Sequence, residues 1–129
     1  VTTTITATAP AAFDAGGGRW AAIFEARTIS INDAGSGLFH HMSGHCIGSD
    51  LLGRLNGVCT YVDRDGDKIV ESFGRETGGR SGTGTLLGGT GKYNGIEGSV
   101  EFTEAPPLAD TAPGQRNLIS TGGGRYTLP

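Results

Sequence analysis

Glycine constrains the fold of this chain more than any other residue. It occupies 24 of the 129 positions, and between Thr83 and Phe102 it alternates with β-branched and aromatic residues without a run of helix formers. A glycine inside a helix costs roughly 1 kcal/mol relative to alanine, whereas its freedom to adopt positive φ suits tight turns and bulges. The sequence therefore predicts an all-β protein of short strands joined by turns.

Strand patterns and turn signals alternate along the whole chain. A helix competes over 20–27, but period-two alternation continues to Ile31, and Asp65-Gly66 is a typical hairpin turn. Pro10 is expected to end the first strand, with a loop over 11–18. The predicted strands are 2–8, 20–31, 38–47, 54–62, 68–75, 82–87, 96–104 and 115–128, the last being one strand or two broken around 122–124. This spacing predicts one domain over 1–129, an eight-stranded antiparallel β-barrel whose closure removes exposed sheet edges.

Charge and hydropathy exclude two classes of partner. The formal net charge is −3, with 10 basic against 13 acidic residues, and the basic residues form no run. A nucleic-acid partner is therefore not expected. No segment approaches the roughly 18 to 20 apolar residues that span a bilayer, and the first residues lack the pattern of a signal peptide. We therefore expect a soluble protein without membrane insertion.

Cys46 and Cys59 are the only cysteines, and they lie thirteen positions apart. This spacing fits neither a zinc site nor a two-spacer redox motif. If the two residues face each other across a hairpin centred near Leu52 and Gly53, they could form a disulfide, which would suit a periplasmic or secreted protein. The alternative is two buried thiols in a cytoplasmic protein.

All three histidines fall within one segment, His40 to His45. On a strand, His41 and His45 would share a face about 13 Å apart, too far to bind one metal ion without other ligands. Each could act as an acid or base near neutral pH. The alternatives are solvent-exposed surface histidines and metal binding.

Several charged residues share strand faces with apolar ones. Glu25 and Arg27 alternate with Ile23 and Ile29, so both charges would lie inside the barrel if that face lines it. In the opposite register Trp20, Phe24 and Ala26 fill the interior instead, and a slip of one residue exchanges the faces.

The fifth predicted strand poses the same question. Glu71 and Arg75 flank Phe73, while Tyr61 on the preceding strand offers a phenol to a bound carbonyl or hydroxyl. The resulting candidate catalytic residues are Glu25, His41, His45, Tyr61, Glu71 and Arg75.

The sequence contains no complete motif for a calcium loop, a phosphate-binding loop or a catalytic nucleophile. The segment 63–67 has glycine at the fourth rather than the sixth position of a calcium loop, and Gly74 stands where the glutamate should be. The segment 88–95 lacks the lysine-serine or lysine-threonine ending of a phosphate loop. No serine or cysteine has the surroundings of a nucleophile. We therefore expect no cofactor and no metal.

Parts of the chain resemble a known group of small barrels. The segments are 59–68, 82–85 and especially 88–99, which reads Gly-Gly-Thr-Gly-Lys-Tyr-Asn-Gly-Ile-Glu-Gly-Ser. Together they resemble allene oxide cyclase-like and dirigent-like proteins, including bacterial ones without an agreed activity. The resemblance covers about a third of the chain. It implies a calycin-like eight-stranded barrel with an apolar cavity, a small lipophilic ligand and a homo-oligomer, either a trimer or a dimer.

Three functions remain open at this point. The first is a cofactor-free isomerase, cyclase or lyase that uses acid/base groups in an apolar cavity on a lipophilic or aromatic substrate. The second is a non-catalytic binding protein for a small hydrophobic ligand. The third is an assembly component whose barrel is filled by its own side chains.

Overall fold

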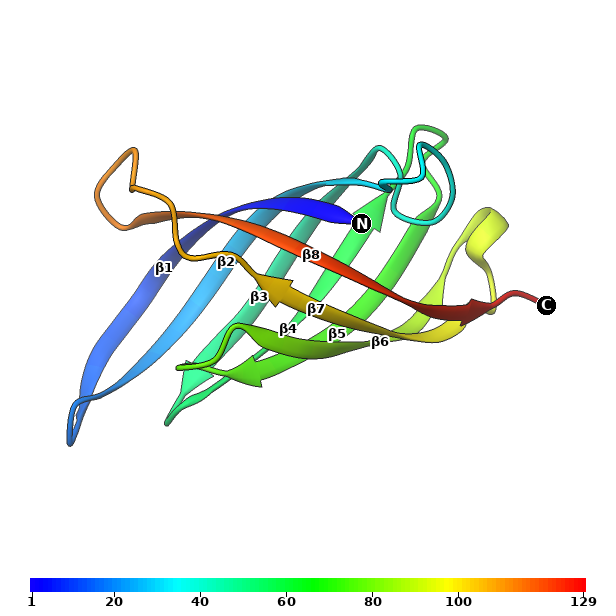
Figure 1. Ribbon diagram of the computed structural model, residues 1–129. Coiled ribbons are helices and arrows are strands. Elements are labelled where there is room, and N and C mark those ends of the chain that lie inside the picture. The colour runs from blue at the N-terminus through cyan, green and yellow to red at the C-terminus, as the bar shows by residue number, and fades with distance from the viewer.

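Eight antiparallel strands close into one barrel in the computed structural model, which describes all residues 1–129 (Figure 1). Each strand pairs with its sequence neighbours, and β8 pairs with β1. The strands are β1 (Thr2–Gly16), β2 (Arg19–Ile31), β3 (Met42–Leu51), β4 (Arg54–Val62), β5 (Lys68–Glu76), β6 (Ser81–Gly89), β7 (Glu97–Glu104) and β8 (Gln115–Thr127), with a 3-10 turn, η1 (Gly91–Tyr93). The predicted fold class is confirmed.

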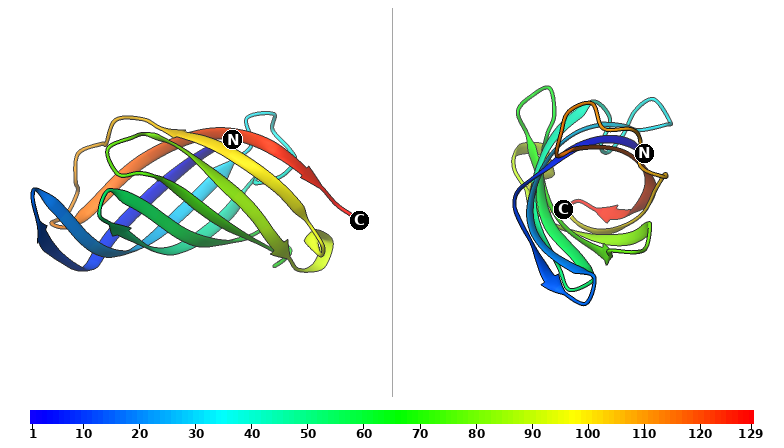
Figure 2. Two further views of the ribbon diagram at one scale, coloured as in Figure 1. Left: turned by 90° about the horizontal axis from the view of Figure 1, so that it is seen from below. Right: turned by 90° about the vertical axis from the view of Figure 1, so that its left-hand side faces the viewer.

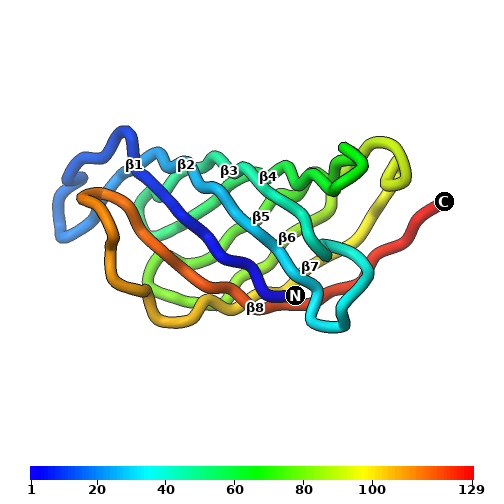
Figure 3. Tube along the Cα trace, turned by 90° about the horizontal axis from the view of Figure 1, so that it is seen from above, coloured from blue at the N-terminus to red at the C-terminus, as the bar shows by residue number.

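The strands surround the interior as a ring in the right-hand view of Figure 2. At one end of the barrel, here called the open end, lie the β1–β2, β3–β4, β5–β6 and β7–β8 connections (Figures 1 and 3). At the other, closed end, Phe39 from the β2–β3 connection and Ile96 from the β6–β7 connection are buried in the core cluster. No helix in the structure has the length and apolarity needed to cross a membrane.

The predicted strand boundaries differ most from the structure in β1 and in β3, which also ends at Leu51 rather than at residue 47. β1 does not stop at Pro10 but continues to Gly16, because an irregularity in pairing between Thr8 and Ala11 accommodates the proline. β3 begins at Met42 rather than at residue 38, because Phe39 and His41 have φ angles of 64° and 52°. This left-handed conformation is incompatible with an extended strand.

Aromatic rings inside the barrel lie over glycines of neighbouring strands. Phe24 pairs with Gly48, Tyr61 with Gly44, Phe73 with Gly57 and Phe102 with Gly82. An added Cβ at any of these glycines would come within 2.9 Å of the partner ring. The glycines therefore allow large rings to lie flat against the inner wall, which leaves the centre of the barrel free.

A valine at Gly57 is expected to test this arrangement. Its Cβ would lie 2.7 Å from the Phe73 ring and 2.8 Å from the carbonyl oxygen of Ile47. The crowding is expected to lower the free energy of unfolding by about 1–3 kcal/mol, measured by chemical denaturation. Gly123→Val is the matched control, because an added Cβ there meets no atom within 4 Å. Equal stability of the two variants would contradict this account of the glycines.

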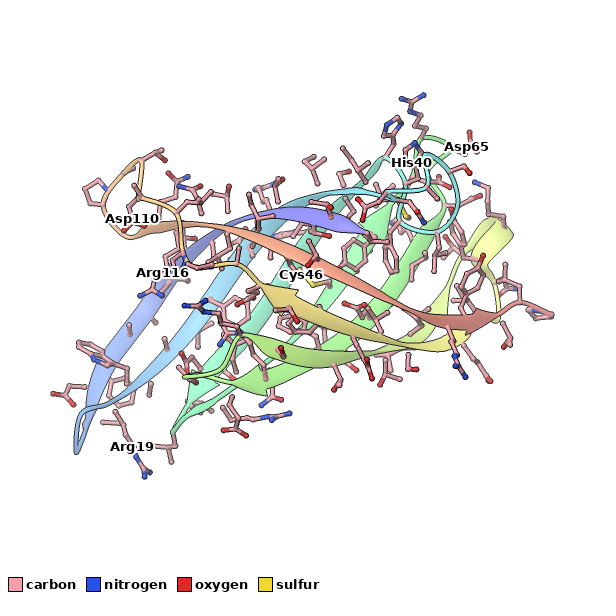
Figure 4. The ribbon with its side chains drawn as sticks, in the orientation of Figure 1. Arg19, His40, Cys46, Asp65, Asp110 and Arg116 are labelled. Atoms are coloured by element: carbon pink, nitrogen blue, oxygen red, sulfur yellow. A yellow bond between two sulfur atoms is a disulfide. The ribbon has the colours of Figure 1, made fainter.

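The two cysteines form a disulfide inside the barrel. Cys46 of β3 and Cys59 of β4 are directly paired across the two strands, and both side chains are buried. Figure 4 shows Cys46 and the sulfur atoms within the barrel. Of the two alternatives that the sequence left open, the structure contains the bonded one.

The acidic turn between β4 and β5 surrounds a lysine. The Lys92 ammonium of η1 contacts the carboxylates of Asp63, Asp65 and Asp67 at 2.5, 2.9 and 3.0 Å. Gly91 makes this approach possible, because its φ is +57° and a Cβ there would overlap the Asp67 carboxylate. The cluster thus ties the β4–β5 turn to η1 at the closed end.

Candidate functional site

A cavity of about 910 Å³ occupies the barrel interior. It extends from the buried cluster at the closed end to the turns at the open end, where Gly18, Gly53 and Thr77 line it. Arg19 and Arg116 also lie at this end (Figure 4). Its volume lies in the range of small-molecule sites.

Three phenylalanines form an apolar belt within this cavity. Phe24, Phe73 and Phe102 come from β2, β5 and β7, and the centroid of the Phe73 ring lies 6.2 Å from that of Phe24 and 6.3 Å from that of Phe102. The belt offers ring faces and edges to an apolar or aromatic molecule.

Glu71 and Tyr61 form an acidic pair in the wall of the cavity. Tyr61 Oη donates a hydrogen bond to Glu71 Oε1 at 3.3 Å, and both residues are buried. Glu71 lies directly across from Cys59, and the ideal Cβ position at Gly84 is only 3.1 Å from Glu71 Oε2. Glycine at position 84 therefore leaves room for the carboxyl group.

The environment of this pair sets its protonation. Burial raises the pKa of Glu71 to about 7, and the hydrogen bond from Tyr61 offsets part of this rise. Burial and the neighbouring carboxylate raise the pKa of Tyr61 as well, so the phenol keeps its proton. Near neutral pH Glu71 can therefore both accept and release a proton, as an acid/base group requires.

Glu71→Gln is expected to stabilise the protein in alkaline solution. The folded state holds the Glu71 proton up to about pH 7, whereas the unfolded chain releases it near the ordinary value of 4.5. Between these pH values the folded state binds more protons, so wild-type stability falls as pH rises through this window. The variant escapes this loss and should be more stable by up to about 3 kcal/mol at pH 8. Denaturation curves of wild type and Glu71→Gln at pH 4 and pH 8 give the difference in their free energies of unfolding. The same difference at both pH values would contradict this prediction.

Arg75 also lines the cavity, but its guanidinium group forms an ion pair and hydrogen bonds within the protein. Its Nη2 lies 2.9 Å from Glu104 Oε2, and its Nη1 donates to the carbonyls of Glu76, Thr77 and Gly79. Both charged side chains are only 12–13% exposed. Arg75 therefore holds the β5–β6 turn at the open end, four residues and about 13 Å along the strand from Glu71.

Of the two registers of β2 that the sequence left open, the structure adopts the one with Glu25 and Arg27 outside the barrel, so the expectation that Glu25 acts in the cavity is wrong. Both lie on the outer face of β2, where Glu25 Oε1 is 2.8 Å from His45 Nε2 and 3.9 Å from Arg27 Nη2. The side chains of the Glu25–His45 pair are about half exposed. The register with Phe24 and Ala26 facing inward is the one adopted.

The predicted shared face of His41 and His45 is also wrong. His41 precedes β3, stacks on His40 at 3.9 Å, and has its Nδ1 3.0 Å from Arg64 Nη2. The charges of His40 and Arg64, with some burial, lower the pKa of His41. The structure thus brings Tyr61, Glu71 and Arg75 to the cavity and leaves Glu25, His41 and His45 outside it.

Sequence reasoning missed a group of hydroxyls in the cavity wall. Thr3, Ser30 and Ser120 all line the cavity, as does Thr28, whose buried Oγ1 has no hydrogen-bond partner. Alternation assigns Thr3 and Thr4 to opposite faces but does not reveal which face is inside. The aromatic–glycine pairs are the signal that could have found the inner face.

The geometry therefore defines a closed antiparallel barrel with an acidic pair in an apolar cavity. Comparison of the chain with family models, curated proteins and solved structures found no match.

Proposed function

We propose that this barrel is a cofactor-free isomerase that moves a proton within a small, largely apolar substrate, with Glu71 as its acid/base. The observation that carries the proposal is a buried carboxyl group in an apolar cavity, hydrogen-bonded to Tyr61 and with a pKa raised to about 7 by burial. A carboxyl of this kind matches the requirement for proton transfer at neutral pH.

The reaction needs no partner beyond the substrate. The Glu71 carboxylate removes a proton from a carbon next to a carbonyl group, and the C–H electron pair passes into the enolate. In a substrate with a C=C bond β,γ to the carbonyl this enolate is a dienolate, and protonated Glu71 then returns the proton to the γ carbon, which gives the conjugated isomer. Tyr61 acts as a positioning residue, because its hydrogen bond to Oε1 leaves Oε2 for the substrate. A cyclase or lyase would use the same first proton transfer.

Hydrogen exchange into a simple ketone tests the proposal without knowledge of the natural substrate. β-Tetralone, a flat two-ring ketone, is incubated in deuterium oxide with the protein, and deuterium uptake is followed by mass spectrometry. Wild-type protein should accelerate uptake above the buffer rate, whereas Glu71→Gln should not. Equal rates with both proteins would refute the role of Glu71.

A non-catalytic binding protein is the second candidate function. The observation in its favour is the apolar belt of Phe24, Phe73 and Phe102 in the middle of the cavity. Saturable binding of β-tetralone without any acceleration of exchange would favour this function. The resemblance to allene oxide cyclase-like and dirigent-like barrels supports a small lipophilic ligand in both cases. On the same basis we propose a homo-oligomer, a trimer or dimer, which light scattering would test.

A further inference from the structure

Three hydroxyl side chains form a row across adjacent strands inside the barrel. Thr3 of β1 pairs directly with Ser30 of β2 on one side and with Ser120 of β8 on the other. All three line the cavity, and Thr3 Oγ1 lies 3.2 Å from Ser30 Oγ. Ser30 and Ser120 are buried, with 1% and 8% of their surface exposed. This hydroxyl row therefore belongs to the cavity wall rather than to the solvent-facing surface.

The strand register shows how the hydroxyl row lies relative to Glu71. Paired residues can be followed from Glu71 perpendicular to the strands in both directions around the barrel. One path runs through Cys59, Cys46, Ala26 and Ala7 to Arg116, and the other through Leu86 and Gly98 to Tyr126. Both paths end on β8, but ten residues apart, and this offset is the shear of the barrel.

The shear places the hydroxyl row at the height of Glu71. β1 lies four strands from β5, halfway around the barrel. The path from Glu71 reaches β1 at Ala7. Halfway around the barrel, half of the shear, about five residues, separates this end point from the position on β1 that lies as far along the barrel axis as Glu71. Counted toward the closed end, that position is about residue 2. Thr3 is an inward-facing residue at this point. Thr3 and its partners therefore face Glu71 across the cavity.

The two walls differ in chemistry. Glu71 supplies a carboxyl group without a cationic partner in the protein, and Tyr61 Oη already donates to it. The opposite wall supplies neutral hydroxyls. Whichever of Thr3 and Ser30 donates to the other, the pair keeps one hydroxyl hydrogen, and Ser120 makes no side-chain hydrogen bond. This wall can therefore donate to an oxygen atom that gains negative charge, as oxyanion holes do.

We propose that Thr3 and Ser120 bind the carbonyl oxygen of the substrate while Glu71 takes a proton from the adjacent carbon. The substrate class is then a neutral unsaturated ketone on an apolar ring body, with the carbonyl toward β8 and β1. This inference rests on the proposed function, because it assigns the groups that bind the carbonyl oxygen while Glu71 acts as the acid/base. The electron pair released from the C–H bond ends on the oxygen held by the hydroxyls, and it returns to carbon when Glu71 gives the proton back.

Binding of two matched probes tests the hydroxyl row apart from catalysis. β-Tetralone and tetralin share one carbon skeleton, but only the ketone carries oxygen. The combined variant Thr3→Val/Ser120→Ala should bind β-tetralone about tenfold more weakly than wild type, the effect of losing one to two hydrogen bonds. Its affinity for tetralin should stay unchanged. Thr4→Val is the matched control, because Thr4 is exposed on the outer face of β1.

Infrared spectra and a conservative variant distinguish loss of the hydroxyl groups from a folding defect. The carbonyl stretch of bound β-tetralone should lie at lower frequency in wild type than in the double variant, because the wild-type hydroxyls polarise the carbonyl and the double variant lacks two of them. Thr3→Ser, which keeps the hydroxyl, should restore part of the affinity. Equal loss of both probes, or an unchanged carbonyl stretch, would overturn the inference even if Glu71→Gln still abolished exchange. Conversely, loss of ketone affinity in the double variant with exchange independent of Glu71 would support the hydroxyl row and refute the proposed function.

Discussion

Replacement of Glu71 by glutamine is expected to slow deuterium uptake into β-tetralone by at least about a hundredfold, because a positioned acid/base contributes 10²- to 10⁴-fold. Glutamine keeps the size of the side chain and still offers an oxygen to Tyr61, so the cavity should retain its shape. The same variant should therefore still bind β-tetralone. Loss of binding together with exchange would show that the substitution had damaged the cavity rather than the chemistry.

The pH dependence gives this prediction a second readout. Only ionised Glu71 can remove the first proton, so the exchange rate should rise with pH and level off above about pH 7, where burial has placed the pKa of this group. Tyr61→Phe removes the hydrogen bond that lowers this pKa, so the midpoint should move to higher pH. A profile that levels off near pH 4.5 would contradict a buried base.

Glu25→Gln is the matched control for Glu71→Gln. Both residues are glutamates on strands of the same barrel, but Glu25 of β2 is on the outer face beside His45. The control should leave both the exchange rate and its pH profile unchanged.

Removal of the disulfide by Cys46→Ala/Cys59→Ala is expected to lower the free energy of unfolding by about 3 kcal/mol. The bond closes a loop of thirteen residues, and a loop of this size restricts the unfolded chain by about that amount. The two sulfur atoms also leave the buried cluster beside Glu71. The midpoint of guanidinium denaturation measures the loss.

Reduced wild-type protein supplies the comparison for this variant. Because dithiothreitol opens the same loop without changing any residue, it should shift the denaturation midpoint in the same direction. A midpoint that is insensitive to both treatments would show that the bond does not constrain the unfolded chain.

The candidate site shows where sequence reasoning succeeded and where it failed. Tyr61 and Glu71 were selected for their chemistry, and the structure joins them by a hydrogen bond in the cavity wall. Glu25 was selected by the same reasoning, because it shares a strand face with isoleucines. That face lies outside, with Ile23 and Ile29 more than half exposed. Hydrophobicity alone therefore did not distinguish the inner from the outer face of β2.

The pairing between strands explains this failure. Phe24 needs a glycine opposite it to lie flat against the wall, and Gly48 on β3 provides one. Ile23 pairs with Ser49 instead, on the outer face. Such a preference is a property of two strands at once, so it cannot be read from the alternation within either of them.

Glycine content, turn residues and alternation determined by themselves that the chain forms eight strands, because these are local properties of the backbone and of neighbouring side chains. Closure of the barrel decided which side of each strand faces the cavity, since a shift of one residue exchanges the two faces. It also decided what faces Glu71: the shear brings Thr3, 68 positions earlier in the chain, to the same height on the opposite wall. The strands were therefore encoded locally, whereas the cavity is enclosed only because β8 pairs with β1.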